Sequence, residues 1–135
     1  MGKKIILVVD DERDMRIFVS TVVETLGFKA IAAHDGAQAL EKASADPPAL
    51  VILDVMMPGI DDGIQTYRQF KSDPALSHIP IIILSAIARK TFLHSIRMLS
   101  PRQGSEVPAP EAYMEKPPDA IELSRMISER LASGT

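Results

Sequence analysis

The chain has 135 residues, of which 46% are hydrophobic, and it carries a formal net charge of −3 and no cysteine. This length suits one domain with a single core, and the lack of cysteine excludes disulfides and thiolate chemistry. A negative chain offers no basic field to nucleic acid, and no apolar run approaches the ~18 residues that span a membrane. We therefore expect a soluble, cytoplasmic domain over residues 1–132 with a frayed tail at residues 133–135, and no direct partner in nucleic acid or membrane.

The first half of the chain alternates between strand and helix patterns. Residues 5–9 are five consecutive aliphatics and predict a buried strand. A helical stripe of apolar residues follows and ends at Gly27, which suits the C′ position of a helix. Residues 28–33 favour a shorter strand nearer the sheet edge, and residues 37–43 favour a helix of small residues.

The second half of the chain begins with the predicted central strand of the sheet. Residues 50–53 are four large aliphatics without alternation, which predicts a central strand buried on both faces. We expect a polar loop through Gly63 and then a third helix that ends before Pro74. Another buried strand is predicted over residues 81–84, and a fourth amphipathic helix follows it.

The segment of residues 100–110 holds three of the ten prolines and has no periodicity. Because Pro101 and Gly104 should prevent any extension of the fourth helix, we expect a polar surface loop outside the core. Residues 112–114 predict a short fifth strand, and Asp119 is a favourable N-cap for the last helix. Five strands that alternate with five helices predict an α/β fold, with a right-handed doubly wound parallel sheet and helices on both faces.

Polar side chains stand where these predicted strands end. They are Asp10 and Asp11 after the first strand, Asp54 after the third, Ser85 after the fourth and Lys116 after the fifth. The carboxyl ends of parallel strands meet at one sheet edge, where ligands bind in open α/β folds. Two carboxylates ~4 Å apart repel by roughly 4 kcal/mol at an effective dielectric of 20, so three of them require a cation. Oxygen ligands without histidine or cysteine favour a hard ion, and a sparse set that leaves room for water and a phosphoryl group suits Mg²⁺ better than Ca²⁺.

These motifs resemble those of bacterial two-component response regulator receiver domains, in particular the chemotaxis-regulator type. The similarity lies in Val8-Val9-Asp10-Asp11, Asp54-Val55-Met56-Met57-Pro58-Gly59, Leu84-Ser85-Ala86 and Lys116-Pro117, in this order over nearly the whole chain. The resemblance implies a flavodoxin-like sheet with strand order 2-1-3-4-5. It also suggests a cis peptide bond between Lys116 and Pro117.

The resemblance further implies that Asp54 accepts a phosphoryl group from a sensor histidine kinase, a histidine phosphotransfer protein or a small phosphodonor. By the same match, Asp11 binds Mg²⁺ directly and Asp10 mainly through water. Asp54 and the backbone carbonyl of Met56 complete the protein's share of the metal site. The expected activity is limited to self-phosphorylation and self-dephosphorylation, which makes the chain a regulatory domain and not an enzyme.

Three further residues receive a role from the resemblance. Ser85 and Lys116 bond phosphoryl oxygens, and Ser85 and Tyr113 form the switch that alters the output face for a downstream protein. A half-buried core tyrosine remains an alternative interpretation of Tyr113. The spacing between Ser85 and Lys116 is longer than in the family, mostly because of residues 100–110. We therefore expect a monomer in which phosphorylation changes the mobility of this segment and so controls partner docking.

Other classes lack the residues that they need. A Mg²⁺-dependent phosphatase of the haloacid-dehalogenase type would have an acid two residues after its nucleophile, where Met56 stands. A flavin-mononucleotide binder needs a loop of amide donors after the first strand, where residues 10–14 are mostly acidic. No GxxxxGK[ST] loop and no GxSxG elbow occurs. A receiver that is part of a longer regulator or hybrid kinase remains the open alternative.

Overall fold

A computed structural model describes residues 2–57, 60–103 and 107–132. Within these ranges the strands are β1 (Ile5–Val9), β2 (Lys29–Ala33), β3 (Leu50–Leu53), β4 (Ile81–Ser85) and β5 (Ala112–Glu115). The helices are α1 (Arg13–Thr25), α2 (Gly36–Ala45), α3 (Ile60–Ser72), α4 (Arg89–Gln103) and α5 (Ala120–Ala132). All strand pairs are parallel and the sheet order is β2-β1-β3-β4-β5, as expected. The predicted tail at residues 133–135 lies outside the described ranges.

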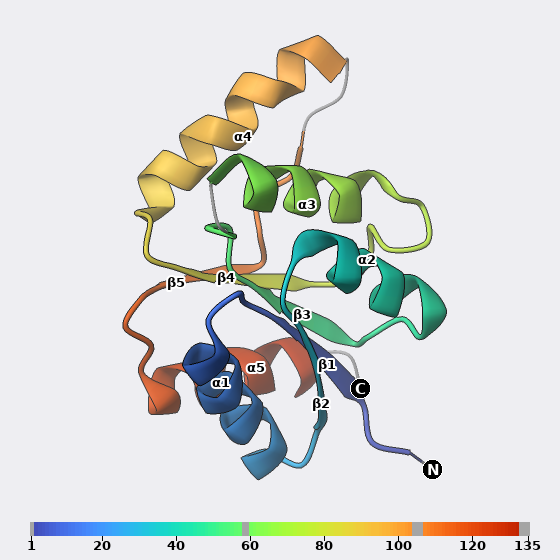
Figure 1. Ribbon diagram of the computed structural model, residues 1–135, viewed down its shortest axis with the longest axis vertical. Coiled ribbons are helices and arrows are strands. Elements are labelled where there is room, and N and C mark those ends of the chain that lie inside the picture. The colour runs from blue at the N-terminus through green and yellow to red at the C-terminus, as the bar shows by residue number, and fades with distance from the viewer. Residues whose placement is uncertain (1, 58–59, 104–106, 133–135) are drawn as a thin grey trace.

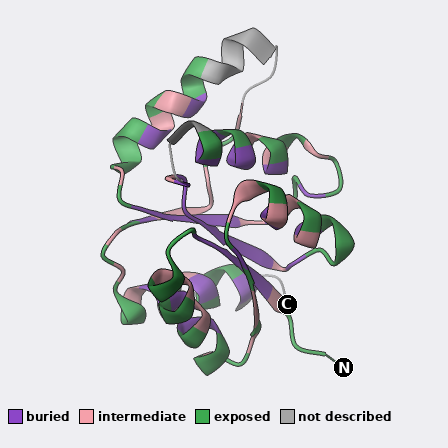
Figure 2. Cartoon of the chain, in the orientation of Figure 1, coloured by how far each residue is buried: buried purple, intermediate pink, exposed green. Residues whose placement is uncertain are grey.

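The sheet lies between two layers of helices (Figure 1). Helices α1 and α5 cover one face, and α2, α3 and α4 cover the other. Each face of the sheet has its own hydrophobic core, and successive β1 residues point into different ones. Leu7 packs on the side of α2, α3 and α4, whereas Val8 packs on the side of α1 and α5. Because both faces are covered, the central strands are buried throughout (Figure 2). This explains why their sequences are apolar without alternation.

Three predicted local features are confirmed. Gly27 follows α1 with φ +94°, the left-handed conformation that glycine adopts without a Cβ penalty. Asp119 caps α5, because its Oδ1 accepts a 2.9 Å hydrogen bond from the Ile121 amide. The peptide bond between Lys116 and Pro117 is cis.

Helix α3 begins earlier than predicted, at Ile60 and not after Gly63. The expectation that the loop continues through Gly63 is therefore wrong. A Cβ added to Gly63 would lie 1.9 Å from the backbone oxygen of Val55, so glycine allows the first helical turn to approach the chain that leaves β3. The polar residue Asp62 is exposed on this turn, which explains why its sequence resembles a loop.

Helix α4 ends later than predicted, at Gln103, and it includes Pro101. The expectation that Pro101 prevents helix extension is thus wrong. A proline inside a helix removes the hydrogen bond to the carbonyl four residues earlier, here that of Arg97. Because Arg97 is exposed, this turn is accessible to solvent, and the loss of one hydrogen bond does not have to end the helix.

The return from α4 to β5 also differs from the expected surface loop. Val107 is partly buried and packs against the core on the α3 side of the sheet. The Tyr67 hydroxyl donates a hydrogen bond to the carbonyl oxygen of Pro108, and Lys71 Nζ donates to Glu111 Oε1 at 3.0 Å. The expectation that the whole of residues 100–110 lies outside the core is therefore wrong for Val107, whereas Pro108 and Ala109 are exposed, as predicted for a surface segment. Residues 104–106 are outside the described ranges.

Candidate functional site

Strand pairing places two aspartates at one edge of the sheet. The Asp54 amide donates to the Val9 carbonyl at 2.9 Å, and the Asp10 amide donates to the Ala33 carbonyl at 3.1 Å. Each aspartate therefore continues the backbone ladder one residue past its strand. Both side chains are buried, with residue exposures of 3%. Two carboxylates held this far from water need a positive partner.

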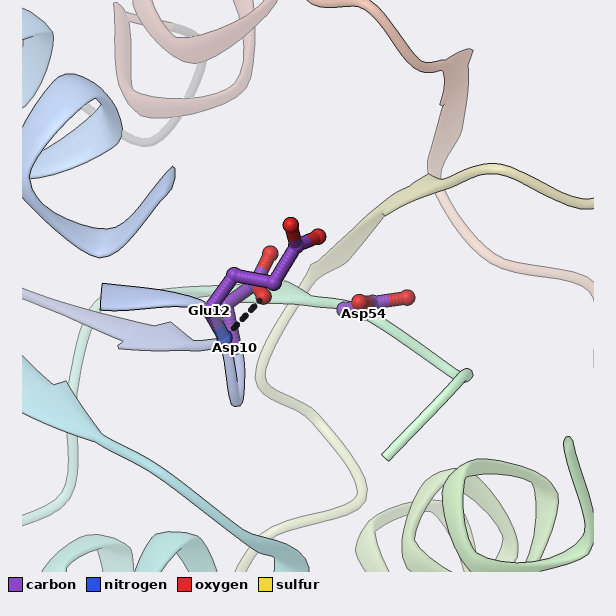
Figure 3. Close-up of side chains that lie close together, drawn as sticks. All are labelled: Asp10, Glu12 and Asp54. Atoms are coloured by element: carbon purple, nitrogen blue, oxygen red, sulfur yellow. Dashed lines mark hydrogen bonds between the residues drawn. The ribbon is translucent and has the colours of Figure 1, made fainter. Parts of the chain in front are cut away.

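The carboxylates that come together are those of Asp10, Glu12 and Asp54, with one oxygen of each within 4.8 Å of the others (Figure 3). The Glu12 amide donates to Asp10 Oδ1 at 2.9 Å, which folds the chain back over Asp10. Asp11 is exposed and is not part of this group of described acids. Glu12 is not among the predicted site residues, although the unbroken run of acids after β1 is a signal that it can contribute.

Lys116 supplies the positive partner from the end of β5. Its Nζ lies 3.0 Å from Asp10 Oδ2, 3.0 Å from Asp54 Oδ2 and 3.1 Å from Glu12 Oε1. The Lys116 amide donates to the Ser85 carbonyl at 2.9 Å, which extends the β4·β5 ladder and fixes the origin of the side chain. Burial lowers the pKa of Lys116, but its hydrogen bonds to the three carboxylates outweigh burial and raise the pKa above the ordinary value. The ammonium group therefore stays charged.

One ammonium does not neutralise three carboxylates, since −3 and +1 leave a formal charge of −2. Burial raises the pKa of Asp10, the nearby charge of Asp54 adds to this, and the bonds from the Glu12 amide and Lys116 oppose it. The site thus retains excess negative charge at a partly desolvated edge. Its donors are carboxylate oxygens, which suit a hard divalent cation.

Asp54 is held on both of its oxygens. The Met56 amide donates to Asp54 Oδ1 at 2.9 Å, while Lys116 bonds Oδ2. The carboxylate therefore has one fixed orientation at the mouth of the site. Of the predicted site residues, Asp10, Asp54 and Lys116 are in direct contact, and Met56 touches Asp54 through its backbone.

Ser85 and Tyr113 meet at the backbone of Ile87. Ser85 is completely buried, and its Oγ is 3.5 Å from the Ile87 amide. The half-buried Tyr113 donates from its hydroxyl to the Ile87 carbonyl at 2.7 Å, and its ring lies 5.6 Å from that of Phe92. Burial, together with the charges of Glu115 and Asp54, raises the pKa of Tyr113 to about 12. The two predicted switch residues are therefore connected through one peptide unit.

The family of response regulator receiver domains matches residues 6–99. The polar-differentiation response regulator DivK of Brucella anthropi is 32% identical over 117 residues, which cover 87% of this chain and 86% of DivK. This chain belongs to the response regulator receiver domain family, whose members are regulatory domains of two-component systems and not enzymes in the usual sense.

Solved structures agree with this assignment. A sensor protein from a Polaromonas species has a TM-score of 0.79 and 26% identity, with 98% of each chain covered. The signal receiver domain of a histidine kinase from Syntrophus aciditrophicus has a TM-score of 0.78 and 26% identity, covering 96% of this chain and 91% of that one. The chemotaxis protein CheY4 of Vibrio cholerae, at 22% identity and a TM-score of 0.77 over 95% of this chain and 98% of CheY4, supports the fold alone.

None of the described helices combines the length and the apolar character that crossing a membrane requires. The three histidines, His34, His78 and His94, are all exposed.

Proposed function

We propose that residues 1–132 form one receiver domain in which Asp54 accepts a phosphoryl group in a two-component phosphorelay. The observation that carries this proposal is the fixed orientation of Asp54, whose two oxygens bond the Met56 amide and Lys116 Nζ at 2.9 and 3.0 Å. A carboxylate held in one orientation beside a cation is prepared for in-line attack on phosphorus. The buried position at the sheet edge limits competing contact with water.

The donor set fits Mg²⁺, which Asp10, Asp11, Asp54 and the backbone carbonyl of Met56 would hold. When bound, the ion supplies positive charge to the phosphoryl oxygens during transfer. The excess charge of −2 at the described carboxylates and Lys116 supports a divalent ion at this edge. Asp11, which is exposed, would turn toward the site to take part.

In the transfer step, an oxygen of Asp54 forms a bond to phosphorus while the bond from phosphorus to the donor breaks. The donor is phosphohistidine of a sensor histidine kinase or phosphotransfer protein, or a small acyl phosphate, and it leaves with the electron pair of that bond. Lys116 donates to a phosphoryl oxygen and offsets the charge that develops there. Ser85 donates a second hydrogen bond once its strand end moves toward the phosphoryl group. Self-dephosphorylation reverses the modification when water attacks the same phosphorus.

The switch follows from the contacts of Ile87. Because the Ile87 amide lies near Ser85 Oγ and its carbonyl accepts from Tyr113, a movement of Ser85 alters the bond that holds Tyr113 beside Phe92. We infer that this change alters the surface that a downstream protein binds. We also propose that the domain acts in the cytoplasm and binds neither nucleic acid nor membrane directly. The same domain would serve equally within a longer regulator or hybrid kinase.

Intact mass spectrometry after incubation with acetyl phosphate and Mg²⁺ tests this function. We expect a single phosphoryl adduct that requires the metal and is absent in Asp54→Asn. Asp46→Asn, which removes an exposed acid at the end of α2, serves as the matched control and should keep the adduct. An adduct that persists in Asp54→Asn, or that forms equally in chelator, would disprove the assignment.

A further inference from the structure

Glu12 occupies the N-cap position of α1 but does not cap the helix. Its backbone is extended, with φ −88° and ψ 119°, and its side chain makes no capping hydrogen bond. Serine, threonine, aspartate and asparagine are the favoured residues at this position. The Glu12 carboxylate instead reaches over the sheet edge, where Oε1 accepts from Lys116 Nζ at 3.1 Å. Departures from a local rule of this kind concentrate at functional sites.

All the hydrogen-bond donors of Lys116 are in use. An ammonium group has three N–H donors and no acceptor. Its three partners are the carboxylates of Asp10, Glu12 and Asp54, at 3.0 to 3.1 Å. A phosphoryl oxygen on Asp54 can therefore bond Lys116 only after one of these carboxylates gives up its place.

Glu12 is the partner that leaves most easily. Its side chain is 65% exposed, whereas those of Asp10 and Asp54 are 4% and 3% exposed. Water solvates Glu12 at once when the ion pair opens, and an exposed pair is a weak interaction. Asp10 stays a carboxylate after transfer, so a buried Asp10 that lost Lys116 would have no such replacement and would be strongly disfavoured. Asp54 keeps one oxygen without phosphorus, which can still accept from Lys116.

We propose that Glu12 is a positioning residue that occupies, in the unphosphorylated protein, the place at Lys116 that a phosphoryl oxygen takes after transfer. This inference rests on the proposed function, because it assigns a competitor for the same lysine. Asp10 and Asp54 keep Lys116 at the site, whereas Glu12 opposes the new bond to the phosphoryl oxygen until it is displaced. Its loss should therefore favour both phosphoryl transfer and the phosphorylated state.

Two substitutions distinguish the effect of losing the ion pair between Glu12 and Lys116 from the effect of losing the negative charge at position 12. Glu12→Ala removes both, whereas Glu12→Asp keeps the charge but shortens the side chain by one methylene and provides a favourable cap for α1. Glu24→Ala, an exposed acid at the far end of α1, is the matched control for the lost charge. The readouts are the rate of acetyl phosphate adduct formation by intact mass, and the affinities for beryllofluoride and for Mg²⁺ alone by amide NMR.

We expect Glu12→Ala and Glu12→Asp to form the adduct about two- to fivefold faster and to bind beryllofluoride tighter by a similar factor, the range that an exposed ion pair permits. The Mg²⁺ affinity of Glu12→Asp, which keeps the charge, and the rate in Glu24→Ala should stay at wild-type values. Wild-type behaviour of Glu12→Asp would assign the effect to charge and overturn the inference, as would slower transfer with weaker Mg²⁺ binding in both variants. Failure of the wild type to form any adduct would instead reject the proposed function.

Discussion

The hydroxyl of Tyr67 in α3 donates a 2.5 Å hydrogen bond to the carbonyl oxygen of Pro108, 41 residues further along the chain. Tyr67 is completely buried, and its ring packs edge to face against Phe92 at 5.2 Å. Phe92 in turn contacts Tyr113, which bonds the loop after Ser85. Contiguous aromatic side chains thus connect the proposed phosphorylation site with the segment that enters β5.

Tyr67→Phe should loosen this segment without unfolding the domain. The substitution removes one hydrogen bond, so we expect a loss of about 1 kcal/mol in the free energy of unfolding. Hydrogen exchange at residues 107–111 should become faster, while β1 and β3 keep their protection. Tyr113→Phe, which removes a hydroxyl bonded elsewhere, is the control. Equal exchange of residues 107–111 in wild type and Tyr67→Phe would show that the hydrogen bond does not hold them.

Gly63→Ala should destabilise the start of α3. The added Cβ would lie 1.9 Å from the Val55 oxygen, a backbone atom that cannot move without displacing the chain after β3. We expect a loss of about 3 kcal/mol in urea unfolding, at the upper end of overpacking effects. Gly2→Ala has no atom within 4 Å of its new Cβ and should leave stability unchanged. Equal midpoints for the two variants would be inconsistent with this packing.

The tyrosines should ionise at unusually high pH. Burial raises the pKa of Tyr113 to about 12, and burial with the charge of Glu111 also raises that of Tyr67. Because the folded-state pKa of Tyr113 lies above its ordinary value of 10.0, its contribution to stability is complete below pH 10 and is lost as the pH rises toward 12. With two tyrosines and no tryptophan, phenolate absorbance of Tyr67→Phe reports Tyr113 alone. A folded-state transition near pH 10 in that variant would contradict the burial argument.

Self-dephosphorylation should be slow, and Met56→Asn should accelerate it. Met56 stands two residues beyond Asp54 and Ile87 two residues beyond Ser85, and neither apolar side chain can orient an attacking water. An amide at position 56 adds one hydrogen bond to that water, which corresponds to about two- to tenfold in rate. Met98→Asn, on the exposed face of α4, is the matched control. Phosphate release that is unchanged or slower in Met56→Asn would refute the prediction.

The sheet could be predicted from the sequence because unbroken aliphatic runs define β1, β3 and β4. The polar residues that follow these runs identify the edge of the sheet at which the site lies. Asp10, Asp54 and Lys116 meet there since parallel strands share one carboxyl end. The part played by Glu12 could not be predicted in this way. It depends on how far a side chain reaches back from the turn after β1, which strand patterns do not determine.

The boundaries of α3 and α4 could not be predicted either, because they depend on the surroundings of each helix end, which are a packed backbone for α3 and solvent for α4. The approach of Gly63 to Val55 brings a polar stretch into α3, and α4 continues past Pro101 because the lost bond falls at an exposed residue. The bond from Tyr67 to Pro108 joins residues that no local pattern relates. The expected monomer, and control of partner docking by residues 100–110, remain predictions.

Chemical localisation of the phosphoryl group tests the central claim most directly. Borohydride reduces an aspartyl phosphate to homoserine, which peptide mass spectrometry assigns to one position. After incubation with acetyl phosphate and Mg²⁺, we predict homoserine at position 54 alone, with Asp10, Asp11 and Glu12 unmodified. Homoserine at Asp10 or Asp11, the longer alcohol 2-amino-5-hydroxypentanoic acid at Glu12, or an adduct that borohydride leaves intact would contradict the assignment of Asp54 as the phosphoryl acceptor.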